Sequence, residues 1–365
     1  MARIWMREGG GPIRAIGNAR RAWSERRGLL VVVEDADGLR GVGEASPLPG
    51  YSPDSLDAVR AALAAWSRRP LGLEASDALR SAVLASESIP PGLPSARFAA
   101  ETACLDLLAR RSGRPMHALL AARLGTRVAD AVPVAALGTL DDLEAAEALI
   151  ARGVTTLKLK IGRSGRFSDE LEALRRLRSE FGGGIDLRLD ANGVWTAGEA
   201  RSRLADLASI RPALVEEPTN DWAGLLASPD LPDVPLALDE SLQRCADPAD
   251  VRPWLDHPCV SAVVVKPTTL GGLGAGLRWI EAARAAGLEI VVSHCFEGPV
   301  AFAALRALAL ACGPTASAAG LGRHAGLDAW PAVDLGGAIG PIHAADLPGT
   351  GLTDDAVERL LAAGR

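Results

Sequence analysis

Short apolar runs and amphipathic helices alternate along most of this sequence. From residue 132 onward, eight apolar runs of strand length recur, and they lie at 132–137, 155–161, 185–190, 213–217, 236–239, 261–266, 288–293 and 315–319. Helical patterns separate them, including 169–181, 196–208, 273–286 and 300–311, and one that Asp141 or Asp142 can begin. Strands that are apolar throughout are buried on both faces, as in a parallel sheet covered by helices. The pattern predicts an α/β fold with a parallel barrel. A doubly wound open sheet is the alternative, although the Gly-x-Gly-x-x-Gly motif of its dinucleotide-binding version follows no early strand.

The first 95 residues have a different pattern, which predicts an α+β domain. Two strands at 29–34 and 39–44, joined by a turn, predict a hairpin. A proline-containing loop follows, and Asp54 is placed to cap a helix over 56–66. The Pro- and Gly-rich segment 88–94 is the predicted boundary.

The remaining chain is predicted to form a barrel domain over 96–335 and a returning tail. Ser95 is placed to cap a helix at 96–108, whose alanines favour close packing. From about 336 the chain is turn-rich and ends in a short helix at 354–362. We expect this tail, 336–365, to pack back onto the N-terminal domain.

Composition narrows the function classes. A formal charge of −6 over 365 residues argues against a general nucleic-acid or anionic-membrane binder. The amino terminus has no apolar signal core, and no apolar run approaches the ~20 residues of a membrane helix. Five scattered cysteines are typical of reduced thiols. We therefore expect a cytoplasmic protein with a small-molecule partner, and the oligomeric state stays open.

The distribution of lysine indicates acid–base chemistry. The chain has 39 Lys and Arg residues, yet lysine occurs only at 158, 160 and 266. Arginine serves most structural uses of positive charge at least as well. Only lysine can lose its proton at accessible pH and act as a base. These three positions are therefore candidates for chemistry.

Polar residues end the predicted barrel strands. They are Lys160, Asp190, Glu216, Asp239 and Lys266. Their spacings of 23 to 30 residues match the size of one βαβ unit, so each is predicted at the carboxyl end of a successive strand, where barrel active sites lie. Because residues two apart on a strand share a face, Lys158 faces the same way as Lys160, and Arg188 the same way as Asp190.

The three carboxylates at strand ends predict a metal site. Unpaired carboxylates that converge repel one another, and a divalent cation relieves the repulsion. An all-oxygen ligand set favours Mg²⁺ or Mn²⁺ over zinc. None of the five histidines has metal-ligand spacing, and His294 is interpreted either as part of the pocket or as structural.

The lysines suggest a mechanism. Strands two and six bring Lys160 and Lys266 to two faces of one substrate. We expect Lys158 and the metal to lower the pKa of Lys160 toward the working range. A metal that binds the substrate carboxylate stabilises the enediolate that forms on proton loss.

As a set, the strand-end motifs resemble the muconate-lactonizing subgroup of the enolase superfamily. They are Lys158-Leu159-Lys160, Asp190-Ala191-Asn192, Glu216-Glu217-Pro218, Asp239-Glu240-Ser241 and Lys266-Pro267. The resemblance implies a modified (β/α)8-type barrel, (β/α)7β, with an α+β capping domain built from both chain ends. Within the subgroup, residues 41–52, 187–192, 265–268 and 326–328 are similar to o-succinylbenzoate synthases.

This resemblance implies a reaction and roles. The reaction is dehydration of 2-succinyl-6-hydroxy-2,4-cyclohexadiene-1-carboxylate to o-succinylbenzoate in menaquinone biosynthesis. Lys160 would abstract the α-proton and then help hydroxide leave, while Lys266 would stay protonated. Asp190, Glu216 and Asp239 would bind Mg²⁺, and Lys158 would be a supporting residue whose charge tunes Lys160. The residues expected to shape the substrate site are Arg188, Pro49, Tyr51, Ser293 and His294.

Four alternatives remain. A dipeptide epimerase shares the lysines but usually carries Asp-x-Asp after strand eight, whereas Ala329 and Trp330 follow Asp328 here. An N-succinylamino acid racemase shares the same site residues. A Schiff-base aldolase would not need three acids. A non-catalytic binding barrel gives no reason to retain the three lysines.

Overall fold

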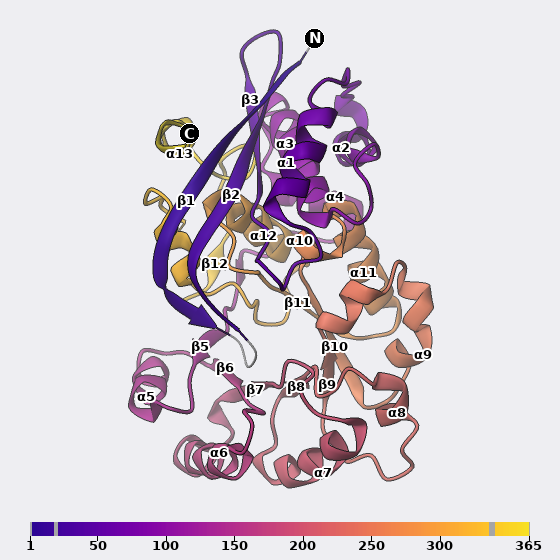
Figure 1. Cartoon of the computed structure of the whole chain (residues 1–365), viewed down its shortest axis with the longest axis vertical. Coiled ribbons are helices and arrows are strands. Elements are labelled where there is room, and N and C mark those ends of the chain that lie inside the picture. Colours follow the sequence, from indigo (N-terminus) through magenta and orange to yellow (C-terminus); the bar gives the residue numbers. More distant parts are fainter. Residues whose placement is uncertain (1, 18–20, 336–339, 365) are drawn as a thin grey trace.

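The computed structural model describes residues 2–17, 21–335 and 340–364 (Figure 1). It contains a three-stranded antiparallel sheet near the amino terminus and a seven-stranded parallel sheet. In Figure 1 the last helix of the chain, α13 (Asp354–Ala363), lies beside the first strand, β1 (Arg3–Gly17). No helix within the described ranges is long and apolar enough to cross a membrane.

The N-terminal sheet has the order β1-β2-β3, formed by β1 (Arg3–Gly17), β2 (Ala22–Glu34) and β3 (Arg40–Ala45). The predicted hairpin is confirmed as β2 and β3. Successive side chains of a strand point to opposite faces. Leu29, Val31 and Val33 accordingly enter the large core beneath the sheet. Leu30 and Val32 enter a second core on the other face, which explains the unbroken apolar run.

Four helices follow: α1 (Leu56–Trp66), α2 (Ala78–Ser86), α3 (Pro94–Arg111) and α4 (Met116–Leu124). Helix α3 is buried along most of its length and packs tightly on β3. A Cβ at Gly43 would lie 1.9 Å from the Ala99 carbonyl oxygen, and one at Gly41 would lie 2.2 Å from that of Ala103. Glycine at both positions permits this close approach.

The two predicted helix caps in this region are wrong. Ser55 caps α1, since its side chain accepts a hydrogen bond from Ala58 N at 3.3 Å. Asp54 instead accepts hydrogen bonds from Ser95 N at 2.8 Å and Ser95 Oγ at 2.9 Å. Helix α3 begins at Pro94, so Ser95 lies within its first turn and is not its N-cap. One carboxylate thus ties the loop before α1 to the start of α3.

The parallel sheet follows chain order and makes a barrel. Its strands are β5 (Ala136–Gly138), β6 (Thr156–Lys160), β7 (Asp186–Asp190), β8 (Leu214–Glu216), β9 (Leu236–Leu238), β10 (Val260–Val265) and β11 (Glu289–Val292). The eighth apolar run forms no strand of its own. Ala319 bridges Val134 and Gly320 bridges Ser293, so this run closes the sheet between its two edges. The predicted barrel class is confirmed.

Helices separate the strands and cover the barrel. They are α5 (Leu143–Ala151), α6 (Phe167–Phe181), α7 (Ala197–Leu207), α8 (Trp222–Leu226), α9 (Arg252–Leu255), α10 (Pro267–Leu270), α11 (Leu273–Ala285) and α12 (Pro299–Ala311). The first apolar run divides: β4 (Ala131–Val132) pairs antiparallel with β12 (Ile342–His343), and β5 begins four residues later. Asp142, one of the two residues predicted to begin α5, is its N-cap.

The C-terminal helix α13 (Asp354–Ala363) packs against the N-terminal sheet. Its Val357, Leu360 and Leu361 share the second core with Leu30 and Val32 of β2. Helix α13 therefore covers part of the face of β2 that α3 does not. The division of domains at residue 95 stays a prediction.

Two buried carboxylates join the N-terminal region to barrel helices. Glu44 on β3 accepts hydrogen bonds from Gly298 N at 2.5 Å, Val300 N at 3.0 Å and Ala301 N at 3.1 Å, at the start of α12. Glu101 on α3 accepts one from Gly274 N at 3.0 Å, at the start of α11. Helix N-termini favour negative charge because their N–H groups are unpaired. These contacts fix β3, and the loop that follows it, over the barrel.

Candidate active site

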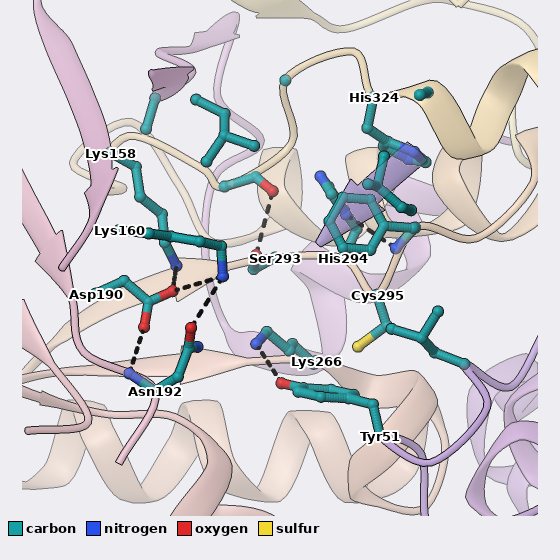
Figure 2. Close-up of a pocket in the computed structure, with 18 of the residues that line it drawn as sticks. Tyr51, Lys158, Lys160, Asp190, Asn192, Lys266, Ser293, His294, Cys295 and His324 are labelled. Atoms are coloured by element: carbon teal, nitrogen blue, oxygen red, sulfur yellow. Dashed lines mark hydrogen bonds and ion pairs between the residues drawn. The ribbon is translucent and has the colours of Figure 1, made fainter. Parts of the chain in front are cut away.

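A cavity of about 270 Å³ opens at the carboxyl ends of the barrel strands. The N-terminal region supplies one part of its lining: Ile16, Trp23, Leu48 and Tyr51. The barrel supplies Lys158, Lys160, Asp190, Asn192, Glu240, Lys266, and a wall that runs from Ser293 to Phe296 and from Gly322 to Ala325. Figure 2 shows Lys158, Lys160 and Asp190 on one side of this cavity, with His294 and His324 on the other.

Strand β6 places two lysines in the barrel interior. Lys158 lies opposite Arg188 in the parallel ladder, and Lys160 lies opposite Asp190. The alternate residues Leu157 and Leu159 are fully buried in the core. The strand therefore turns its apolar side chains to the helices and its lysines to the cavity.

Lys158 lies among carboxylates. Its Nζ is 3.0 Å from Asp190 Oδ2 and also pairs with Glu216 Oε2. Burial disfavours the charged amine, but Asp190 and Glu216 outweigh this and raise the pKa of Lys158. Lys158 is therefore a fixed cation in this arrangement.

Lys160 has a more open environment, with 27% of its side chain exposed. Its Nζ donates to Asn192 Oδ1 at 3.0 Å and lies 3.7 Å from Asp190 Oδ2. Asn192 adopts a positive φ of 49° and also donates from Nδ2 to Glu240 Oε1 at 3.0 Å. Asn192 thereby orients the Lys160 amine at the cavity wall.

Lys266 follows β10 directly and approaches from another side of the barrel. Three strands separate β6 and β10 in the sheet. The Lys266 Nζ lies 2.5 Å from Asp239 Oδ2 and 2.9 Å from the Tyr51 hydroxyl, as Figure 2 shows for Tyr51. Burial opposes the charge, but Asp239 raises the pKa of Lys266 well above its usual value. This lysine is therefore held protonated.

The three carboxylates predicted as metal ligands end adjacent strands, and all are buried. Asp190 lies opposite Glu216 in the ladder, and Asp239 directly follows β9. Burial raises the pKa of Asp190, but Lys158 outweighs it and the net pKa is lowered. Burial raises the pKa of Asp239 in spite of Lys266. The lysine ammonium groups neutralise much of this negative charge.

The donor set fits Mg²⁺ in kind, since it consists of carboxylate oxygens. Asp239 Oδ1 is buried and has no hydrogen-bond partner among the described residues, so one acceptor is available. With the lysines paired as they are, however, no three acidic, His or Cys side chains in the described ranges converge closely enough to hold an ion. The metal site therefore stays a prediction.

Glu217 connects the ends of β8 and β9 through hydrogen bonds. It is fully buried and accepts hydrogen bonds from Asp239 N at 2.9 Å and from Ser241 Oγ. Burial raises the pKa of Glu217 to about 8. Its φ of 41° is rare for a non-glycine residue, so these contacts hold a strained backbone between two strand ends.

The wall opposite the lysines follows β11 and the eighth run. Ser293 and His294 line the cavity as the sequence predicted, and Ser293 Oγ donates to Gly320 O at 3.2 Å. The His294 ring lies 4.1 Å from the ring of His324, centroid to centroid, and 5.2 Å from that of Phe296. His324 and Phe296 were not predicted as site residues, because neither ends a strand.

Two residues expected in the substrate site lie outside the cavity lining. Arg188 donates to Ala318 O at 2.6 Å and to Ser317 Oγ at 2.8 Å, so it holds the eighth run within the barrel. The Pro49 side chain is exposed, and its carbonyl accepts a hydrogen bond from Trp23 Nε1 at 2.9 Å. Tyr51, from the same loop, does line the cavity.

Comparison with known proteins defines the class. A family model described as Enolase C-terminal domain-like matches residues 141–357, and one described as Mandelate racemase / muconate lactonizing enzyme, N-terminal domain, matches residues 3–121. The chain therefore belongs to the enolase superfamily, and it is an enzyme of that superfamily.

Individual relatives have several activities. Muconate cycloisomerase 1-2 of Acinetobacter lwoffii is 30% identical over 279 residues, covering 74% of this chain and 71% of its own length. The o-succinylbenzoate synthase of Desulfotalea psychrophila is 30% identical over 306 residues, covering 74% of this chain and 80% of its own length. The solved structure of the dipeptide epimerase of Methylococcus capsulatus is complexed with Mg and the dipeptide L-Arg-D-Lys. It matches with a TM-score of 0.77 at 26% identity, covering 96% of this chain and 98% of that chain.

Proposed function

We propose that this enzyme dehydrates 2-succinyl-6-hydroxy-2,4-cyclohexadiene-1-carboxylate to o-succinylbenzoate, as in menaquinone biosynthesis. The observation that carries the proposal is the placement of Lys160 and Lys266, which reach one cavity from strands β6 and β10. The motif resemblance and the similarity to an o-succinylbenzoate synthase support this member of the superfamily.

The proposed reaction removes a proton and a hydroxide from one face of the ring. Lys160 in its neutral form accepts the α-proton at Nζ, while Asn192 Oδ1 holds one of its N–H groups in place. The C–H electron pair first moves into the substrate carboxylate to give an enediolate, and then forms the new ring double bond as the C–O bond breaks. The same Lys160 ammonium returns its proton to the leaving oxygen, so the products are the aromatic carboxylate and water.

Charge that develops on the substrate carboxylate needs stabilisation, because a carbon acid beside a carboxylate is weak. Lys266 supplies a fixed positive charge, since Asp239 and Tyr51 hold its ammonium in the cavity. Mg²⁺ held by Asp190, Glu216 and Asp239 would supply further positive charge at the same carboxylate. Lys158, paired with Asp190 and Glu216, would position the first two of these ligands.

N-succinylamino acid racemisation is the second candidate. It is favoured by the same feature, because lysines on opposite sides of a cavity can remove a proton from one face and return one to the other. Dipeptide epimerisation has less support. Asp328, the first acidic residue after the eighth run, is paired with Arg323.

A side-by-side assay tests the proposal. Purified protein with Mg²⁺ is given the cyclohexadiene carboxylate, an N-succinylamino acid and a dipeptide, and kcat/KM is measured for each. We expect dehydration to have the largest kcat/KM. Absence of dehydration, with racemisation or epimerisation present, would overturn the proposed function.

A further inference from the structure

His324 is a buried polar residue without a hydrogen-bond partner in the described chain. Its side chain lines the cavity, and only 7% of the residue is exposed. Neither Nδ1 nor Nε2 has a partner among the described residues. Buried polar groups are nearly always hydrogen-bonded, so an unpartnered one that lines a cavity indicates a ligand contact.

Aromatic rings fix the position of the His324 ring. It lies against the His294 ring at 4.1 Å with a tilt of 35°, and edge-on to Phe302 at 5.1 Å and to Phe296 at 5.6 Å, centroid to centroid. A Cβ at position 326 would lie 2.9 Å from His324 Nδ1, so Gly326 leaves the room that the ring occupies. Packing therefore holds the ring in place at the cavity wall, where neither nitrogen has a partner among the described residues.

We propose that His324 binds a second carboxylate of the substrate, at the end remote from Lys160, and so determines specificity for dicarboxylates. The proposal rests on the proposed function in one respect, namely that the cavity accepts a carboxylate whose α-proton Lys160 removes. The proposal assigns a binding residue to the carboxylate at the succinyl end of the substrate. The strand-end motifs supply no residue for that carboxylate.

The charges around His324 favour an anion over an ammonium group. Arg323, which is paired with Asp328, lines the cavity beside it, and the buried Arg26 acts on it from the N-terminal sheet. The two carboxylates in the lining, Asp190 and Glu240, lie at the lysine end, where Asn192 and the lysines bind them. An ammonium group at the histidine wall would lack a carboxylate among the described lining residues, whereas a carboxylate would accept the imidazole N–H.

Burial and the neighbouring His294, Arg26 and Arg323 all lower the pKa of His324 well below its usual value. The imidazole is therefore neutral and carries one N–H, which either nitrogen can hold. A neutral donor suits an anion that must be released as part of the product, because the donor binds the anion without forming a full ion pair.

Ligand binding tests the proposal without turnover. With Mg²⁺-loaded protein, calorimetry compares o-succinylbenzoate with 2-butanoylbenzoate, in which a methyl group replaces the distal carboxylate. We expect the wild type to bind the dicarboxylate about tenfold or more tightly, as one good hydrogen bond to a charged group allows. His324→Phe keeps an aromatic ring against His294, and it should bring the two dissociation constants within about twofold.

Two further variants separate this role from a structural one. His324→Gln retains an N–H and should restore part of the preference for o-succinylbenzoate. His343→Phe changes an exposed histidine outside the cavity lining and should leave both dissociation constants at the wild-type values.

The outcomes are distinct. Equal binding of the two benzoates by the wild type, including binding of neither, would show that the inference is wrong, whatever the dehydration assay gives. Preference that persists in both His324 variants would also overturn it. Preference that depends on His324, in a protein that does not dehydrate the cyclohexadiene, would sustain the inference and refute the proposed function.

Discussion

Lys266 and Tyr51 meet across the boundary between the barrel and the N-terminal region, with 2.9 Å between the ammonium nitrogen and the phenol oxygen. Tyr51 also donates to Glu240 Oε1 at 3.3 Å, and its ring faces the Lys266 ammonium at 5.4 Å. It is the only tyrosine in the sequence. Tyr51→Phe should keep the ring contact and remove the hydrogen bond to a charged group. We expect kcat/KM to fall between roughly tenfold and a hundredfold.

The measurement for Tyr51→Phe is steady-state kinetics together with the unfolding free energy. The loss should appear mainly in kcat, because the Lys266 charge acts on the reacting carboxylate. Unchanged kinetics in a normally folded variant would show that Tyr51 contributes only to the shape of the cavity.

Lys160→Arg isolates proton transfer from charge. Arginine keeps the positive charge near Asp190 but cannot give up its proton to become a base. Turnover should fall by roughly 10²–10⁴-fold, the usual contribution of a positioned acid or base. Exchange of the substrate α-proton in D₂O, followed by NMR, should be lost to the same extent. Arg176→Lys on the exposed face of α6 is a matched control that should exchange normally, and near-normal exchange in Lys160→Arg would refute the proposed base.

Metal removal tests the carboxylate set. Dialysis against a chelator should abolish activity, and Mg²⁺ should restore it. Asp239→Asn should weaken Mg²⁺ binding by more than roughly tenfold, a loss seen even for residues that only support metal ligands. Asp230→Asn, at an exposed position outside the cavity lining, is the control for removing one charge. Full activity of the metal-free protein would exclude the proposed magnesium site.

The strand ends were predictable from the sequence because buried parallel strands appear in it as short, wholly apolar runs at regular spacing. Lys160, Asp190 and Glu216 each end a strand, as that spacing implied. The period of two also gave the correct face for Arg188, but it carries no information on depth. Arg188 lies two residues before the end of β7, where its guanidinium binds the eighth run instead of lining the cavity.

Features that depend on packing between distant segments were not predictable in this way. Strand β1 was missed because its three consecutive glycines, Gly9 to Gly11, resemble a turn. Asn192 lies within a recognised motif, yet its contact with Lys160 depends on a left-handed backbone conformation. His324 follows the eighth run in a loop, and only the folded barrel brings it onto His294. Such contacts join residues far apart in the chain, which local patterns do not encode.

Glu101 makes the stability of the fold depend on pH. It is buried, and burial raises its pKa from 4.5 to about 7, although Gly274 N and Ser86 Oγ donate hydrogen bonds to it. Between these two pKa values the folded protein holds a proton that the unfolded chain has released, so this residue's contribution to stability falls as pH rises through the window. From pH 5.5 to 8 the loss should be about 2 kcal/mol.

Glu101→Gln removes the titration while retaining an oxygen acceptor for the start of α11. The unfolding free energy of this variant, relative to wild type, should therefore increase by about 2 kcal/mol between pH 5.5 and pH 8. Urea denaturation at both pH values measures it, and Glu172→Gln, exposed on α6, is the matched control. Because each variant is compared with wild type at the same pH, titration of all other groups cancels. If the difference in unfolding free energy between Glu101→Gln and wild type is the same at both pH values, Glu101 is ionised throughout this range. In that case the α11 N-terminus stabilises its charge more than burial opposes it.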